Sequence, residues 1–207
     1  MHSQTKSSID IAQNESYLKS TLDHLSTERF ALKRATQLSF FKTDISFGGS
    51  LLKNGNAREP RPLSTKNFLH IVLKSDVAKQ TDVNDLRMTS KRLKVAAIIK
   101  GRSTDFGVRI HSQAIASNHI HLLISFKSRK KYIQWIRRLT GLIARLMLGA
   151  EKGKPSQKSF WSYRPFTRIV YWGRDFRAVS AYIGRNVLEA IGFIDYVPRS
   201  YTKISSG

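Results

Sequence analysis

The run from His119 to Phe126 alternates between apolar and other side chains over most of its length. Such alternation is typical of a β-strand, in which residues i and i+2 point to the same face. His119 and His121 would share one face, with Cα atoms about 7 Å apart at the rise of a strand. The apolar face would consist of Ile120, Leu122, Ile124 and Phe126. Two imidazoles at this spacing can bind one divalent cation if a third ligand comes from another element.

The charge of the chain indicates a polyanionic partner. The 207 residues include 36 Lys and Arg against 14 Asp and Glu, a formal net charge of +22. Each Lys or Arg that neutralises a nucleic-acid phosphate releases counterions, so nucleic acid is the favoured partner. A membrane surface is the competing polyanion, but no segment approaches the roughly 20 apolar residues of a membrane-spanning helix. The first residues also lack the apolar region of a signal peptide, so we expect a cytoplasmic, nucleoid-associated protein with no membrane partner.

The absence of cysteine limits the metal chemistry. It excludes disulfides and thiolate ligands, so any metal site must use nitrogen or oxygen ligands.

The order of the expected elements predicts an α+β fold. Four strands and three helices are indicated by periodicity and by turn residues. The strands are expected at 68–74, 108–116, 119–126 and 166–172, and the helices at 87–105, 130–148 and 175–191. This β-α-β-β-α-β order predicts a ferredoxin-like (split βαβ) antiparallel sheet with helices on one face, followed by one more helix.

Residues outside this pattern are expected to form extensions. We interpret 1–66 as a basic, partly irregular N-terminal extension, 67–194 as the folded domain and 195–207 as a C-terminal tail. A plain disordered tail is the favoured interpretation of residues 1–34.

The last expected helix carries a second candidate constellation. Tyr182 and Asn186 are four residues apart and therefore share one helix face, one turn from each other. A phenol nucleophile would then lie beside an amide oxygen that can complete a His-His-Asn metal site. Glu189 is the nearest carboxylate and could orient the site or ligate as well. Such a ligand set suits Mg²⁺ or Mn²⁺ and leaves most of the cation charge available to a phosphate oxygen.

The two motifs together resemble a known family. Asn118-His119-Ile120-His121-Leu122-Leu123, followed by Tyr182-Ile183 and Asn186, resembles the single-tyrosine HUH transposases, in particular the REP-associated tyrosine transposase branch. The resemblance runs from about residue 40 to 192 and includes Arg61-Pro62-Leu63, Phe160-Trp161 and the run from Trp172 to Arg177. Two departures stand out, because Val187 occupies a position that is often Pro in relatives, and 1–34 has no counterpart.

The resemblance implies a mechanism and a role for each site residue. His119, His121 and Asn186 would bind the metal, and Tyr182 would be the nucleophile. The expected activity is cleavage and rejoining of single-stranded or hairpin DNA through a 5′-phosphotyrosine intermediate, in DNA transposition by a mobile element or in a host role. One tyrosine makes one cut per site, so paired cuts need a homodimer or sequential turnover.

A basic segment follows the histidine strand. No acidic residue occurs between Asp105 and Glu151, which favours a surface that tracks a nucleic-acid backbone. The DNA-binding candidates are Lys127, Arg129, Lys130, Lys131, Arg137 and, in the last strand, Arg168.

Other interpretations stay open at this point. A non-catalytic nucleic-acid-binding ferredoxin-like module has a similar layout, and a phosphodiesterase with water as its nucleophile would use the same metal. We expect His70 and His111 to be packing or edge histidines. Four aromatic residues could either stack on unpaired bases or pack in the core: Trp161, Tyr163, Trp172 and Phe176.

Overall fold

The computed structural model describes residues 45–53, 60–80, 85–149 and 159–195. The predictions for residues 1–34 and for most of the C-terminal tail lie outside these ranges. Within them, no helix is long and apolar enough to cross a membrane.

Five antiparallel strands form one sheet in the order β1-β5-β2-β4-β3. The strands are β1 (Ser46–Phe47), β2 (Phe68–Lys74), β3 (Val108–Ile115), β4 (His119–Phe126) and β5 (Phe166–Val170). The last four of these have the ferredoxin-like arrangement predicted from the sequence, so the α+β fold class is confirmed.

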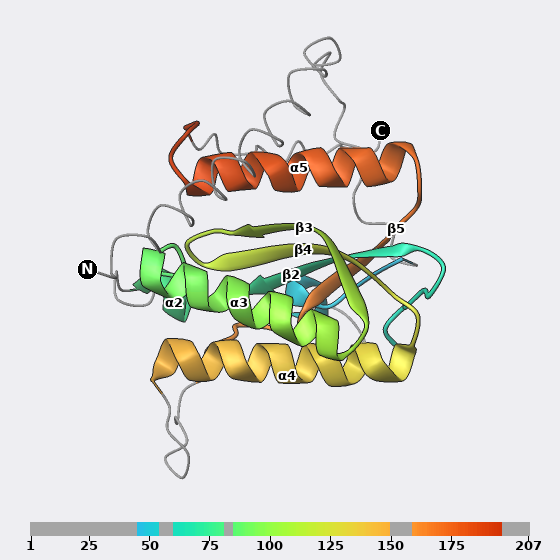
Figure 1. Ribbon diagram of the computed structural model, residues 1–207, viewed down its shortest axis with the longest axis horizontal. Coiled ribbons are helices and arrows are strands. Elements are labelled where there is room, and N and C mark those ends of the chain that lie inside the picture. The colour runs from blue at the N-terminus through green and yellow to red at the C-terminus, as the bar shows by residue number, and fades with distance from the viewer. Residues whose placement is uncertain (1–44, 54–59, 81–84, 150–158, 196–207) are drawn as a thin grey trace, which may run out of the picture. The chain divides into compact units, whose positions relative to one another are not determined.

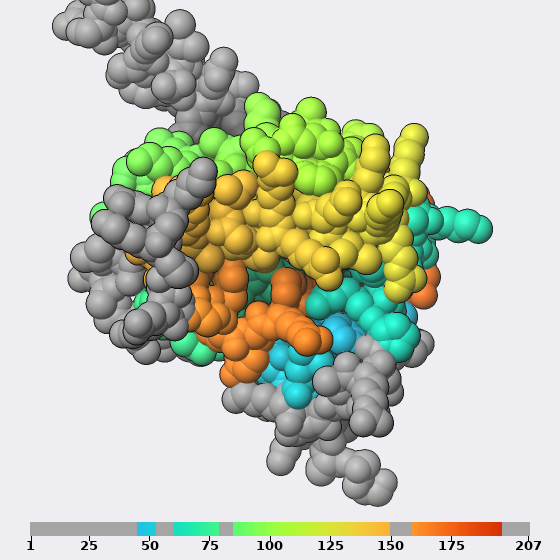
Figure 2. Space-filling view, turned by 90° about the horizontal axis from the view of Figure 1, so that it is seen from below, coloured from blue at the N-terminus to red at the C-terminus, as the bar shows by residue number. Residues whose placement is uncertain are grey.

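One face of the sheet is covered by α3 (Thr89–Asp105) and α4 (Arg129–Leu148), as Figure 1 shows. Seen from the side of α4, the two helices lie beside each other (Figure 2). In the strands, every second side chain points to this face and adds to the apolar core. The helix α4 adds a buried stripe of side chains at helical spacing. That stripe consists of Tyr132, Trp135, Leu139, Ile143 and Met147.

The ends of α4 show why it spans these residues. The Ser128 side chain accepts a hydrogen bond from the backbone N–H of Lys131, as an N-cap residue does. Gly149 then ends the helix in the left-handed conformation, with φ of 63°.

The other face of the sheet is covered by α5 (Arg174–Ala190) (Figure 1). Its Val179 and Ile183 are buried, which orients the helix along the sheet. The side chains of the strands that point away from the core, including His70 and His121, therefore lie beneath α5.

Several predicted boundaries shift by one or two residues. The helix predicted from 87 begins at Thr89 and ends, as predicted, at Asp105. Leu93 of this helix is 62% exposed. The strand predicted to 172 ends at Val170, because the chain turns there into α5 and the Tyr171 N–H donates to the Asp175 carboxylate (3.1 Å).

Part of the stretch expected to be irregular contributes to the sheet. Ser46 and Phe47 pair with Arg168 and Thr167 of β5, and the 3₁₀ helix η1 (Gly49–Lys53) follows. Gly48 makes the turn between them at φ of 90°, where a Cβ would lie 2.2 Å from the Pro165 carbonyl oxygen. The domain boundary at residue 66 stays a prediction. A short helix, α2 (Val77–Gln80), follows β2.

Candidate active site

A pair of buried histidines lies on the α5 side of the sheet. In the register of β2 and β4, His70 is opposite Leu123 and His121 is opposite Val72, so the two histidines are diagonal neighbours on one face. The His70 Nε2 lies 3.1 Å from the His121 Nδ1, and the rings stack at 5.3 Å between centroids. Their exposed fractions are 7% and 4%. The tertiary fold thus gives His121 a hydrogen-bond partner from another strand.

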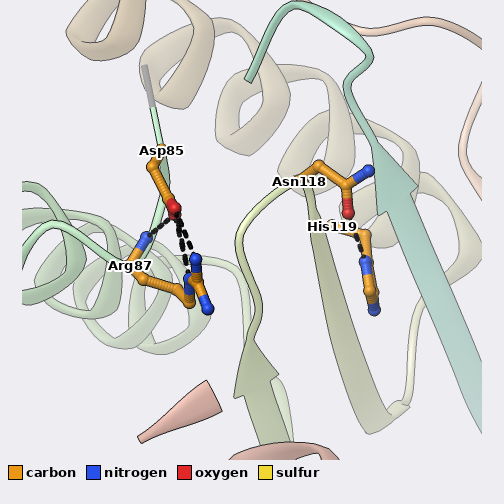
Figure 3. Close-up of polar contacts among 4 residues, drawn as sticks. All are labelled: Asp85, Arg87, Asn118 and His119. Carbon is orange, nitrogen blue, oxygen red and sulfur yellow. Dashed lines mark hydrogen bonds and ion pairs between the residues drawn. The ribbon is translucent and has the colours of Figure 1, made fainter. Parts of the chain in front are cut away.

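His119 lies next to this pair at the start of β4. Its Nδ1 is 2.8 Å from the side-chain oxygen of Asn118 (Figure 3). An amide oxygen accepts but does not donate, so this contact places the proton on Nδ1 and the lone pair on Nε2. The rings of His119 and His121 are 4.8 Å apart between centroids and nearly perpendicular. The two imidazoles predicted to share a cation are therefore brought together.

The structure also brings Tyr182 to the histidines. Its ring centroid lies 5.3 Å from that of His121 and 6.2 Å from that of His70, and both contacts are edge-on. Tyr182 immediately precedes the buried Ile183, so the packing of α5 on the sheet sets the position of the phenol.

Asn186 is buried one turn after Tyr182 on α5. Its Nδ2 donates to the Tyr182 carbonyl oxygen at 2.7 Å. The side-chain oxygen is therefore the atom of this amide that can accept a hydrogen bond or bind a metal. Glu189 forms an ion pair with Arg185 at 3.0 Å, and its predicted role in the site stays a prediction.

These residues fit a divalent cation held by mixed nitrogen and oxygen ligands. No group of three His, Cys, Asp or Glu side chains positioned to hold a metal occurs in the described part of the chain. The candidate donors would instead be His119, His121 and the Asn186 oxygen. Neutral imidazole and amide oxygen are ligands that Mn²⁺ accepts and that Mg²⁺ takes together with waters.

Burial controls the protonation of His70. The pKa of this imidazole is lowered to about 4, chiefly by burial and in addition by the nearby Arg168, whereas Asp175 opposes both effects. Arg168 itself forms an ion pair with Asp175 at 2.8 Å. His70 is consequently neutral near pH 7 and can serve as a hydrogen-bond acceptor.

The predicted DNA-binding residues divide between the two sides of the sheet. Arg168 is paired with His70 across β5 and β2, so it lies on the α5 side. The rest are exposed along α4 or just before it, on the layer opposite Tyr182: Lys127, Arg129, Lys130, Lys131 and Arg137. The structure does not bring these five residues to the tyrosine, and their contact with DNA stays a prediction.

The structure distinguishes among the aromatic candidates. Trp161 donates its Nε1–H to the Thr140 carbonyl oxygen at 2.9 Å and packs against the core. Trp172, in contrast, is 76% exposed. Its ring contacts those of Phe68 and Phe176, at 5.7 and 5.3 Å between centroids. These three rings form an aromatic surface at the start of α5.

A hollow of about 460 Å³ lies between the end of α5 and the segment before α3. That segment is tied to the β3–β4 turn, because the Leu86 N–H donates to the Ser117 carbonyl oxygen at 3.0 Å. Arg87 binds Asp85 there through two guanidinium nitrogens (Figure 3), and this hydrogen bonding raises the Arg87 pKa. The hollow is lined by Asp85, Arg87, Met88 and residues 189–192.

Sequence reasoning missed two contributions to this site. His70 was expected to be a packing residue, although its place in the alternation of β2 already put it on the face away from the core. The supporting contact of Asn118 was also not foreseen, although Asn118 directly precedes His119.

Comparison with known proteins identifies the family. The family model described as "Transposase IS200 like" matches residues 66–186, more than half of the chain. A solved REP-associated tyrosine transposase, bound to a REP hairpin, is 13% identical with a TM-score of 0.47, covering 67% of this chain and 76% of that one. A structure from Deinococcus radiodurans R1, assigned as a transposase, is 16% identical with a TM-score of 0.38, covering 62% and 97%. No curated protein matches the chain.

The matched residues contain the three histidines of the cluster, Tyr182 and Asn186. They begin just before β2, which carries His70, and they end at Asn186. Transposases cut and join DNA in transposition, and a site that presents a tyrosine beside paired histidines agrees with such an enzyme. The chain is a member of the IS200-like transposase family.

Proposed function

We propose that this transposase is a metal-dependent endonuclease and strand transferase for single-stranded or hairpin DNA, with Tyr182 as its nucleophile. The observation that carries the proposal is the placement of the Tyr182 ring 5.3 Å from that of His121, within the same cluster as His119. Mg²⁺ or Mn²⁺, held by His119, His121 and Asn186, would supply Lewis-acid polarisation of the scissile phosphate.

The reaction conserves one phosphodiester bond in each step. The phenol oxygen of Tyr182 loses its proton and forms a bond to phosphorus, while the bond from phosphorus to the 3′-oxygen breaks. The leaving oxygen takes up a proton and becomes a 3′-hydroxyl, and the 5′-phosphate stays on the tyrosine. A different 3′-hydroxyl can then attack the phosphotyrosine and join new ends, which hydrolysis by water does not allow.

The aromatic surface supports the single-stranded part of the proposal. An exposed tryptophan fixed by two neighbouring rings offers a face on which an unpaired base can stack. Phe176 precedes Tyr182 by six residues on α5, or about 9 Å along the helix axis. The exposed Arg174 and Arg177 add positive charge to the same turn of α5. A base next to the scissile phosphate could therefore reach this surface.

The remaining partner assignments are also proposals. The five basic residues on and before α4 would bind DNA backbone away from the cleavage site, on the opposite layer. Hairpin DNA is proposed as a second substrate beside single-stranded DNA. A homodimer would allow paired cuts, and a protein that acts on chromosomal DNA would be cytoplasmic and nucleoid-associated.

The test is a covalent-adduct assay. The protein is incubated with end-labelled single-stranded and hairpin DNA and with Mg²⁺ or Mn²⁺, then resolved on a denaturing protein gel. We expect a labelled band near the mass of the protein, which Tyr182→Phe and His121→Ala abolish. Tyr171→Phe is the matched control, because it removes a half-exposed phenol from the turn between β5 and α5 and should keep the band.

Two results would replace this mechanism by its alternatives. Cleavage that persists in Tyr182→Phe without a labelled band would show that water is the nucleophile. DNA binding with neither cleavage nor adduct, on several hairpin substrates, would indicate a non-catalytic binding module.

A further inference from the structure

The contact between His70 and His121 has no part in the mechanism described so far. His70 lies on β2, is buried beneath α5, and places its Nε2 3.1 Å from the His121 Nδ1. Burying a polar ring at this position disfavours the fold unless a hydrogen bond compensates for the loss of water. The His121 contact is such a bond, and it falls on a residue expected to bind a metal.

The consequence for His121 follows from the two nitrogens of an imidazole. A neutral ring carries its proton on one nitrogen and its lone pair on the other. With Nδ1 directed at His70, the nitrogen available for a metal is Nε2, which requires the proton of His121 to be on Nδ1. The His70 Nε2 would then be the acceptor, with its own proton on Nδ1.

The neighbouring ligand shows the same arrangement with a different partner. The Asn118 oxygen accepts from the His119 Nδ1 at 2.8 Å and leaves the His119 Nε2 with a lone pair. Both candidate ligands thus use Nδ1 for a hydrogen bond within the protein, so each would bind a cation through Nε2. Metal-bound histidines commonly have such a supporting hydrogen bond, which fixes the tautomer and the ring orientation.

We propose that His70 is a positioning residue of the metal site, which accepts a hydrogen bond from the His121 Nδ1 and holds His121 in the tautomer that binds metal through Nε2. The inference rests on the metal-binding part of the proposed function. It does not depend on Tyr182 or on DNA cleavage.

The experiment combines NMR with metal titration on the full-length protein. Long-range ¹H–¹⁵N spectra of the metal-free wild type report which nitrogen of His121 is protonated, and calorimetry measures Mn²⁺ affinity. The variants are His70→Phe, which removes the acceptor, and His70→Gln, whose side-chain oxygen can replace the Nε2 acceptor. The matched control is His111→Phe, because His111 lies on the same side of the sheet but is bonded to Ser125 at 2.9 Å.

We expect His121 of the wild type to be protonated on Nδ1, the less populated tautomer of histidine in water. His70→Phe should weaken Mn²⁺ binding by about 10- to 100-fold, the usual effect of removing a supporting partner. His70→Gln should recover most of the affinity, and His111→Phe should match the wild type. Backbone ¹H–¹⁵N spectra of each variant separate these effects from misfolding.

Three results would overturn the inference. They are a His121 protonated on Nε2 in the metal-free wild type, unchanged Mn²⁺ affinity in a folded His70→Phe protein, and equal losses in the Phe and Gln variants. Failure of the proposed function itself would look different, since Mn²⁺ binding would then be insensitive to His119→Ala and to His121→Ala.

Discussion

Acid should destabilise the metal-free protein through His70. Burial is the main cause of its lowered pKa, which is about 4 in the folded state against an ordinary value of 6.5. The groups that face the ring are Arg168 on β5, His121 on β4, and Asp175 and Tyr182 on α5. A histidine whose pKa is lowered in the folded state does not reduce the free energy of unfolding at pH values above its ordinary pKa, because it is neutral in both states. The free energy of unfolding decreases as the pH falls from 6.5 towards 4, because the unfolded chain takes up the proton first.

The magnitude follows from the size of the shift. One pKa unit corresponds to about 1.36 kcal/mol, so a shift from 6.5 to about 4 is a maximum of roughly 3 kcal/mol. By the linkage relation, the folded protein has already lost about 2 kcal/mol of its free energy of unfolding at pH 5. This loss is a large fraction of the free energy of unfolding of a typical domain, which is about 5–15 kcal/mol.

The assay is urea unfolding in the presence of EDTA at pH 7 and pH 5, for the wild type and for His70→Phe. We expect the wild type to lose about 2 kcal/mol more than the variant between the two pH values, because phenylalanine cannot take up a proton. Equal losses in the two proteins would refute the reasoning. His111→Phe serves as the control, and it should retain most of the acid sensitivity of the wild type.

Three further outcomes are expected. Gly48→Ala should lower the free energy of unfolding by about 2 kcal/mol or more, because φ is 90° there and a Cβ would meet the Pro165 carbonyl. Gly141→Ala lies in the middle of α4, where a Cβ meets no other atom. This variant should instead raise the free energy of unfolding by up to about 1 kcal/mol in the same denaturation assay. Trp172→Ala should weaken binding of single-stranded DNA by about 5- to 150-fold in fluorescence anisotropy, which corresponds to the loss of about 1–3 kcal/mol for one stacked base. Trp172→Phe should keep most of the affinity, because phenylalanine still offers a ring. Equal affinities of the wild type and Trp172→Ala would exclude stacking. Burial raises the pKa of Tyr132 to about 12, and its hydroxyl has no hydrogen-bond partner among the described residues. Tyr132→Phe should therefore be as stable as the wild type or more so at pH 7, and should lose less stability above pH 10, as measured by thermal unfolding.

The sequence alone determined the elements and the local geometry of the two motifs. Period-two alternation is a property of a single strand, so it placed His119 and His121 on one face of β4 before any partner strand was known. Helical spacing did the same for Tyr182 and Asn186 on α5. The β-α-β-β-α-β order then restricted the fold to a ferredoxin-like sheet, because connections in such a fold are short and the strands antiparallel.

Only the tertiary structure decided which residues complete the site. The contact of His70 with His121 depends on the register between β2 and β4, and neither strand encodes that register by itself. The exposure of Trp172 likewise depends on how β5 turns into α5, since its composition suits a core position equally well. The basic residues of α4 were found on the layer opposite Tyr182 because the apolar stripe of that helix packs on the other face of the sheet. Contacts between elements distant in sequence arise from packing, and local periodicity contains no information about them.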